Sequence, residues 1–356
     1  MKSVRNMAPA IVTLNNTGAD VGRRITSILG AGQVHGYVER VSDPDVPFLI
    51  VQEHLRDLFS ADCTIIAIMS SGIVIRALGG LVQRKQSEAP VLCVSEDGLN
   101  VVPLLGGHRG ANALALRVAQ GLETRAAITT AGESRFGMAL DDPPTGWRCS
   151  NPAAAKPVMA ALLAGDPVYI ENNLKTGVDI EWLPVDRTRI SKPTSGPVLA
   201  LSETTAEIDV FTLHPATHVI GIGCERGIAL DDIRSLVETC LADAGVALGA
   251  VACLATIDLK EDEPAFRELA SELELPLRLY TATELEAETY RVSSASTYVF
   301  EAVGCHSVAE AAALRSAGAN ANLVIQKRKN GRATCAIACS DNIIDPTAAG
   351  RACGRL

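Results

Sequence analysis

Residues 67–112 have the sequence AIMSSGIVIRALGGLVQRKQSEAPVLCVSEDGLNVVPLLGGHRGAN, whose pattern of strand, turn and helix signals indicates the fold class. Apolar, mostly β-branched residues at 63–69 predict a buried strand. The small residues at 70–72 allow a tight turn, and the pattern at 73–82 predicts a helix. A strand that turns directly into a helix is typical of α/β proteins, and the N–H groups at the start of such a helix can bind an anion.

A second motif lies in the same stretch. Apolar runs at 91–95 and 100–105 flank the turn pair Asp97-Gly98 and predict a β-hairpin. The second run leads into GGHRGAN at 106–112, before a helical pattern at 113–121. Three glycines around one histidine and one arginine would let a ligand approach the backbone closely.

Alternating strand and helix patterns on both sides of this stretch predict the domain organisation. Strand 10–14, a turn at 15–20 and helix 21–29 precede it, and a strand at 126–130 closes the first unit. We expect two α/β units with mostly parallel sheets, joined by a small irregular α+β middle domain. The expected bounds are 1–140 for the N-terminal domain, 141–215 for the middle domain, 216–340 for the C-terminal domain and 341–356 for a loose tail.

Local signals also define details of the C-terminal domain. Strands are expected at 219–223, 250–257 and 276–280, alternating with helices. Ser307 and Glu310 predict a capping box at the start of a helix over 307–317. A hairpin around Asn330-Gly331 closes the domain.

Composition excludes several classes of protein. A hydrophobic fraction of 47% with 21% charged residues is that of a globular protein, and a net charge of −9 argues against nucleic acid as a partner. No apolar run is long enough to span a membrane, and we expect a cytoplasmic protein. The ten cysteines form no C-x-x-C pair, so we expect no metal site.

Several motifs, in this order and spacing, resemble the cobalamin-biosynthesis family CbiG, the cobalt-precorrin-5A hydrolases. They are MSSGIVIRALGG at 69–80, the EDG turn at 96–98, VPLLGGHRGANALALRVA at 102–119, GIGCERG at 221–227 and VGCHSVAEAAAL at 303–314. The resemblance implies a hydrolase that opens the δ-lactone of a ring-contracted cobalt tetrapyrrole and releases acetaldehyde. It implies no cofactor of the protein itself, since the substrate contains the cobalt, and it allows other cobalamin-pathway enzymes or a second copy of the chain as partners.

Candidate site residues follow from these motifs. His108 titrates near working pH and is the candidate general base, with Glu96 to orient it or to hold a water. Backbone N–H groups and cations would bind the carboxylates and the oxyanion of the substrate. The candidate substrate-binding residues are Ser70, Ser71, Gly72, Arg76, Lys85, Gly106, Gly107, Arg109, Asn112, Gly223, Cys224 and Arg226.

Alternative interpretations remain at this point. A carrier that holds an unstable corrinoid without catalysis would use the same anion sites. A hydrolase acting on another polycarboxylate is a third possibility. GIGCERG lacks the G-x-G-x-x-G spacing of a dinucleotide site, which argues against a nicotinamide enzyme. Cys224 could be a nucleophile at a helix start, although a small residue making the turn is the simpler interpretation. His35 and His54 show no surrounding cluster, which predicts packing or surface roles.

Overall fold

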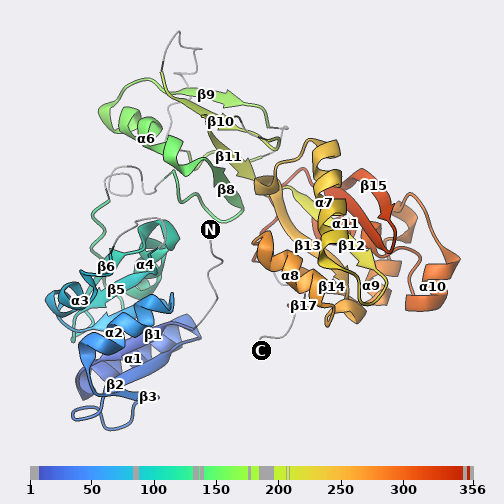
Figure 1. The fold of residues 1–356 in the computed structure, drawn as a ribbon. Coiled ribbons are helices and arrows are strands. Elements are labelled where there is room, and N and C mark those ends of the chain that lie inside the picture. The colour runs from blue at the N-terminus through green and yellow to red at the C-terminus, as the bar shows by residue number, and fades with distance from the viewer. Residues whose placement is uncertain are drawn as a thin grey trace. The chain divides into compact units, whose positions relative to one another are not determined.

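The computed structural model describes residues 8–82, 88–130, 136, 140–174, 178–183, 196–205, 207, 209–347 and 351–352. The chain forms two compact units, Met1–Asp142 and Pro143–Leu356 (Figure 1). In the described residues no helix combines the length and the apolar character that a membrane span requires. The predicted α/β class is confirmed, with sheets that are mostly parallel.

Unit 1 is built on a seven-stranded sheet with the order β3-β2-β1-β4-β5-β6-β7. All neighbours are parallel except β5 and β6, which form the predicted hairpin. Its strands are β1 (Ala10–Thr13), β2 (Gln33–Tyr37), β3 (Val46–Phe48), β4 (Ile65–Ile68), β5 (Val91–Val94), β6 (Asn100–Leu105) and β7 (Arg125–Ala126). The closing strand is therefore shorter than the predicted 126–130.

Helices cover both faces of this sheet. Helices α1 (Asn16–Leu29) and α4 (Ala111–Gly121) pack in one apolar core, and α2 (Val51–Ser60) and α3 (Ser71–Leu78) pack in another. Each core also contains side chains of β4 and β5, because alternate residues of a strand point to opposite faces. The turn predicted at 15–20 is wrong: Asn15 caps α1, which begins at Asn16.

Unit 2 contains two sheets. A four-stranded sheet has the order β8-β11-β10-β9 and helix α6 (Ala155–Ala164) beside it. Its strands are β8 (Trp147–Ser150), β9 (Tyr169–Asn172), β10 (Val198–Leu201) and β11 (Phe211–Pro215). Strands β8 and β11 were not predicted, and they bring several polar side chains into this part of the chain.

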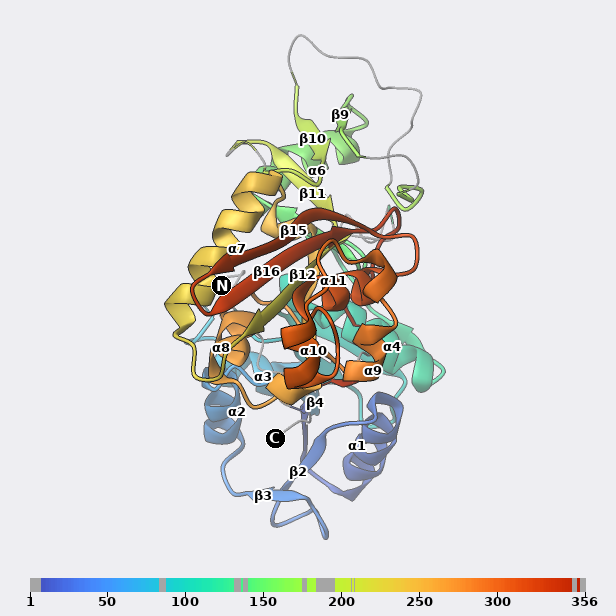
Figure 2. The same ribbon diagram turned by 90° about the vertical axis from the view of Figure 1, so that its right-hand side faces the viewer.

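The second sheet of unit 2 has the order β15-β16-β12-β13-β14-β17. Helices α7 (Leu230–Ala244) and α8 (Pro264–Glu272) pack in one core, and α11 (Ala309–Ala317) packs in another (Figure 2). Two short helices, α9 (Ala282–Glu286) and α10 (Thr297–Val303), complete this part. The strands are β12 (His218–Cys224), β13 (Val251–Ile257), β14 (Leu277–Tyr280), β15 (Asn322–Asn330), β16 (Ala333–Cys339) and β17 (Arg351–Ala352).

Two predictions about unit 2 are wrong. Helix α11 begins at Ala309, and no side chain of the described residues caps it, because the Glu310 carboxylate accepts hydrogen bonds from Ser293 and Lys327 instead. The loose tail predicted for 341–356 is the second, because the described residues of this segment form hydrogen bonds with the rest of unit 2. Ile344 N donates to Ala216 O at 2.8 Å, and β17 pairs with β14.

Candidate functional site

The sheet of unit 1 has a topological switch point between β1 and β4. The chain runs from β1 outward to β2 and β3, then returns to β4 on the other side of β1. The connections after β1 and β4 lead into α1 and α3, which pack in different cores. In open α/β sheets this arrangement opens a crevice outside the carboxyl ends of the strands, where ligands usually bind.

Register aligns three polar residues at this edge. Thr13, Ile68 and Val94 end the pairing of β1, β4 and β5 and lie opposite one another. Asn15, Ser70 and Glu96 each follow two residues later. Neighbouring strands lie about 4.8 Å apart, so these three positions line one short stretch of the edge. We call Asn15, Ser70, Ser71, Gly72, Arg76 and Glu96 the switch-point edge.

The start of α3 supplies the donors of the switch-point edge. No hydrogen bond from a side chain caps this helix in the described part of the chain, and Ile73 N donates to Ser70 O at 2.9 Å. The guanidinium of Arg76 folds back over Gly72, where an added Cβ would lie 3.3 Å from Arg76 Nη1. An exposed cation therefore lies beside a helix N-terminus, and the two together favour an anionic group.

Glu96 supplies the carboxylate of the switch-point edge. Asn15 Nδ2 donates to Glu96 Oε1 at 2.7 Å, while Asn15 Oδ1 accepts from Gly18 N at 2.9 Å. Asn15 therefore positions the carboxylate and caps α1 at once. Asn15 was not among the predicted site residues, although an Asn directly after a strand is a common helix cap.

Asp97 makes the hairpin turn, as the sequence analysis preferred for it. Its carboxylate accepts from Leu99 N at 2.9 Å and from the Ser95 hydroxyl. The hydrogen bond from Ser95 is the main cause that lowers the pKa of Asp97. The Asp97 carboxylate is thus held within its own turn.

GGHRGAN lies at the opposite edge of the same sheet. Strand β6 runs antiparallel to β5 and pairs Leu105 with Val91, so its end returns to the start of β5. The structure therefore does not bring Glu96 and His108 together, and Glu96 does not orient that histidine. His108 lies in a short 3-10 turn, Gly107–Arg109, and its side chain is outside the described structure. Lys85 falls in 83–87, outside the described residues.

The other predicted residues of this loop have partners within the protein. Arg109 forms a two-pronged ion pair with Asp62, and its side chain is only 8% exposed. Asn112 is buried in the first turn of α4. Gly106 has φ +77°, and an added Cβ would lie 2.6 Å from Pro90 Cα. Close packing therefore explains this glycine without a ligand, and substrate contacts of the loop stay a prediction.

GIGCERG forms the end of β12 and the connection that follows it. An added Cβ at Gly223 would lie 2.7 Å from Thr334 Oγ1, so this glycine makes room for the neighbouring strand. Arg226 pairs with Asp262 at 3.0 Å. Cys224 ends a strand six residues before α7, and burial raises the pKa of its thiol to about 11. The nucleophile interpretation of Cys224 is therefore not supported.

A pocket of about 430 Å³ in unit 2 contains a serine–histidine pair that the sequence analysis missed. His214 Nδ1 donates to Ser202 O at 2.6 Å, because a carbonyl can only accept. His214 Nε2 then accepts from Ser150 Oγ at 3.0 Å, and burial lowers the pKa of this imidazole. A neutral histidine that accepts from a serine hydroxyl can act as a base for that serine.

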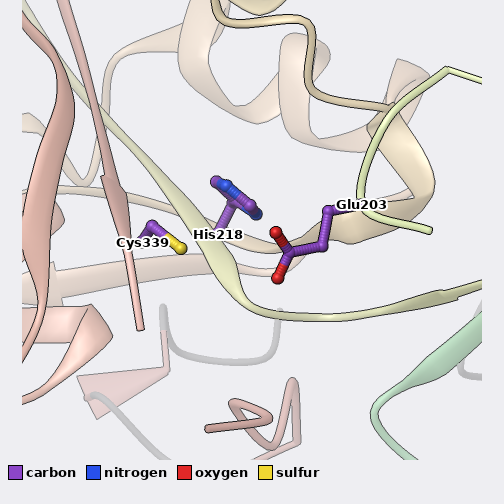
Figure 3. Close-up of side chains that lie close together, drawn as sticks. All are labelled: Glu203, His218 and Cys339. Carbon is purple, nitrogen blue, oxygen red and sulfur yellow. The ribbon is translucent and has the colours of Figure 1, made fainter. Parts of the chain in front are cut away.

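A second buried cluster of unit 2 has the donor types of a metal site. One donor atom each of Glu203, His218 and Cys339 lies within 4.8 Å of the other two (Figure 3). No metal site was predicted because the cysteines form no C-x-x-C pair, and these three residues come from segments that are distant in the sequence. The pairing of His218 with Cys339 across the sheet would have been a signal, but a single sequence does not reveal it.

In comparisons with known proteins, each of the two units matches a domain of the same protein family. The family described as Cobalamin synthesis G N-terminal matches residues 53–133, and Cobalamin synthesis G C-terminus matches residues 218–338. A cobalt-precorrin-5A hydrolase of Priestia megaterium is 25% identical over 355 residues, which cover 92% of this chain and 94% of that protein. A cobalt-precorrin-5A hydrolase of Salmonella typhimurium (strain LT2) is 29% identical over 271 residues, 72% of this chain and 77% of that one. Protein CobE of a Sinorhizobium species is 43% identical over 120 residues, 34% of this chain and 78% of that protein.

Proposed function

The chain belongs to the CbiG family of cobalamin-synthesis proteins, and from this premise we propose that it is a cobalt-precorrin-5A hydrolase. The reaction opens the δ-lactone of a ring-contracted cobalt tetrapyrrole and releases a two-carbon fragment as acetaldehyde. The cobalt belongs to the substrate. The relatives that cover most of the chain have this activity in their names, so the non-catalytic carrier is the less favoured alternative.

We propose the switch-point edge of unit 1 as the place of lactone opening. The observation that supports it is the Arg76 guanidinium folded over Gly72 at the start of α3, together with Glu96 in the turn that follows the neighbouring strand β5. The substrate has many carboxylates around its ring, and a cation at a helix N-terminus would bind one of them. The edge also supplies a carboxylate that can accept a proton, which the lactone chemistry requires.

Each group of the switch-point edge has a role in this proposal. Glu96, held by Asn15, removes a proton from a water that attacks the lactone carbonyl. The N–H groups of Ser71 and Gly72 stabilise the tetrahedral oxyanion. When the ring C–O bond breaks, the leaving alkoxide takes the proton from Glu96, which leaves a hydroxyl and a carboxylic acid on the substrate, and the acid releases its proton to solvent. C–C cleavage then follows in a retro-aldol-like step: the new hydroxyl gives its proton to the Glu96 carboxylate, its C=O bond forms as the C–C bond breaks, and the electron pair passes to the conjugated ring and its cobalt.

Acetaldehyde release from three variants tests this placement. We expect Glu96→Gln to lower turnover ~10²–10⁴-fold, because a glutamine cannot accept the proton. His108→Ala, at the other edge of the sheet, and Ser150→Ala, in the pocket of unit 2, serve as matched controls. We expect both to keep turnover within about threefold, below the effect of removing a general base.

The same variants separate the alternatives. Loss of turnover in His108→Ala with normal turnover in Glu96→Gln would move the chemistry to the GGHRGAN edge. Loss confined to Ser150→Ala would move it to the pocket of unit 2. A wild-type chain that binds the macrocycle and releases no acetaldehyde would support the carrier.

A further inference from the structure

We propose that Glu203, His218 and Cys339 form a binding site for one structural divalent metal ion with the ligand preferences of zinc. The site is separate from the substrate's cobalt and from the proposed lactone site. It lies within unit 2, where the connection after β10 meets the ends of β12 and β16 (Figure 3).

Strand register places two of the three ligands together. His218 is the first residue of β12 and Cys339 is the last residue of β16, and the two are direct partners in the antiparallel pairing. Side chains of such partners point to the same face with their Cβ atoms about 5 Å apart. The sheet therefore holds the imidazole and the thiol beside each other without a contribution from either side chain.

Glu203 reaches the pair from the four-stranded sheet. It follows β10 by two residues, and its backbone carbonyl accepts from Ala247 N at 2.9 Å. Its carboxylate accepts from Thr217 Oγ1 at 2.9 Å. Thr217 directly precedes His218, so this hydrogen bond brings the carboxylate to the end of β12.

The hydrogen bonds of Thr217 select the tautomer of His218 that binds a metal. The single hydroxyl proton of Thr217 goes to Glu203 Oε1, since a carboxylate only accepts. His218 Nδ1 lies 3.0 Å from Thr217 Oγ1 and must then donate its own N–H to that hydroxyl oxygen. The ring lone pair is left on Nε2, as in metal-bound histidines whose other nitrogen donates to a neighbour.

Burial and ligand chemistry indicate the kind of ion. The exposed fractions are 8% for Glu203, 2% for His218 and 7% for Cys339, so the site is closed to a bulky substrate. Thiolate, imidazole and carboxylate together suit zinc, whereas magnesium and calcium prefer oxygen ligands alone. Tetrahedral zinc places its donor atoms about 3.5 Å apart, which small side-chain rotations achieve from a cluster within 4.8 Å.

Charge also balances in the loaded site. Binding releases the thiol proton of Cys339 to solvent, and the two positive charges of the ion offset the thiolate and the carboxylate. A water molecule would complete the fourth position. The ion would then link the connection after β10 to the six-stranded sheet, which gives it a structural role.

Metal analysis of the untagged, full-length chain tests the site. We expect about one zinc per chain after purification without chelators, as for a closed protein site. After removal of zinc, added Co²⁺ should produce a thiolate-to-cobalt charge-transfer absorption in the near ultraviolet. Cys339→Ala should abolish this absorption. Cys335→Ala is the matched control, because it removes another buried thiol of β16, and it should retain the absorption.

A wild-type chain that holds no zinc and gives no charge-transfer absorption with Co²⁺ would overturn the proposal. Retention of the absorption in Cys339→Ala would also overturn it. If Cys339→Ala does not fold, X-ray absorption of the zinc-loaded wild type decides the matter. We expect one sulfur at about 2.3 Å with nitrogen and oxygen neighbours, and a shell without sulfur would refute the site.

Discussion

At the scale of single residues, histidine environments differ according to what the fold packs around them. His35 on β2 is buried, and its Nδ1 lies 2.8 Å from His54 Nε2 of α2. The His54 ring also stacks on Phe48. The packing role that the sequence analysis allowed for both residues is therefore confirmed.

Acid should destabilise the protein through His35. Burial, followed by the neighbouring His54, lowers the pKa of His35 to about 4. The folded state therefore binds this proton less readily than the unfolded chain, whose histidines titrate near 6.5. The contribution of neutral His35 to the free energy of unfolding is fully present above about pH 6.5. It is lost as the pH falls toward about 4, and the loss is at most about 3 kcal/mol. Urea denaturation of the wild type across this range measures the loss.

His35→Gln removes the titrating group and should flatten this acid dependence. The wild-type acid profile, measured in the same buffers, is the reference. An unchanged acid profile in His35→Gln would contradict the assignment.

At the scale of elements, Glu310 at the start of a helix forms hydrogen bonds with two other segments of the chain. The residue is fully buried in the first turn of α11. Its carboxylate accepts from Ser293 N at 2.8 Å and from Lys327 N at 2.7 Å. One side chain thus connects α11, the loop before α10 and strand β15. Because these long-range hydrogen bonds occupy the carboxylate, the capping box predicted from the local sequence does not form.

Glu310→Gln should destabilise the protein by about 2 kcal/mol, because an amide cannot accept all of these hydrogen bonds and its NH₂ group would face other donors. Urea denaturation at neutral pH measures the change. Glu301→Gln, at an exposed position of α10, is the matched control and should change stability by less than about 0.5 kcal/mol. Equal effects of the two substitutions would contradict the bridging role.

At the scale of the whole molecule, the C-terminal segment completes unit 2. Ile344 packs against the core beneath α11, and Asp345 O accepts from the buried Arg278 Nη2 at 2.6 Å. Ile344 N also donates to Ala216 O, directly after β11 of the four-stranded sheet. The segment therefore contacts both sheets of unit 2.

Two truncations test this role. Removal of 341–356 should lower the free energy of unfolding by about 2–4 kcal/mol, because an apolar side chain and a partner of Arg278 are lost. Removal of 348–356 alone keeps these contacts and should cost less than about 1 kcal/mol, since the two-residue β17 makes few hydrogen bonds. Calorimetry of both chains measures the difference, and equal stabilities would show that residues 341–347 contribute nothing.

Elements whose signals are local could be predicted from one amino-acid sequence. The runs that became β4 and β5, the Asp97-Gly98 hairpin and the helical face of α7 depend on neighbours two to four residues away, so one chain is enough to predict them. Short or polar strands such as β8 and β11 have weaker local patterns and were missed.

Which functional groups lie close together depends on contacts between distant segments, and these could not be predicted from the sequence. The reversal at the hairpin separates His108 from Glu96, although only eleven residues lie between them. Strand register brings Asn15 beside Glu96 and His218 beside Cys339 across long stretches of chain. The physical reason is that backbone pairing and burial of the sheet faces set these distances, and neither depends on the identity of the polar side chains that they bring together.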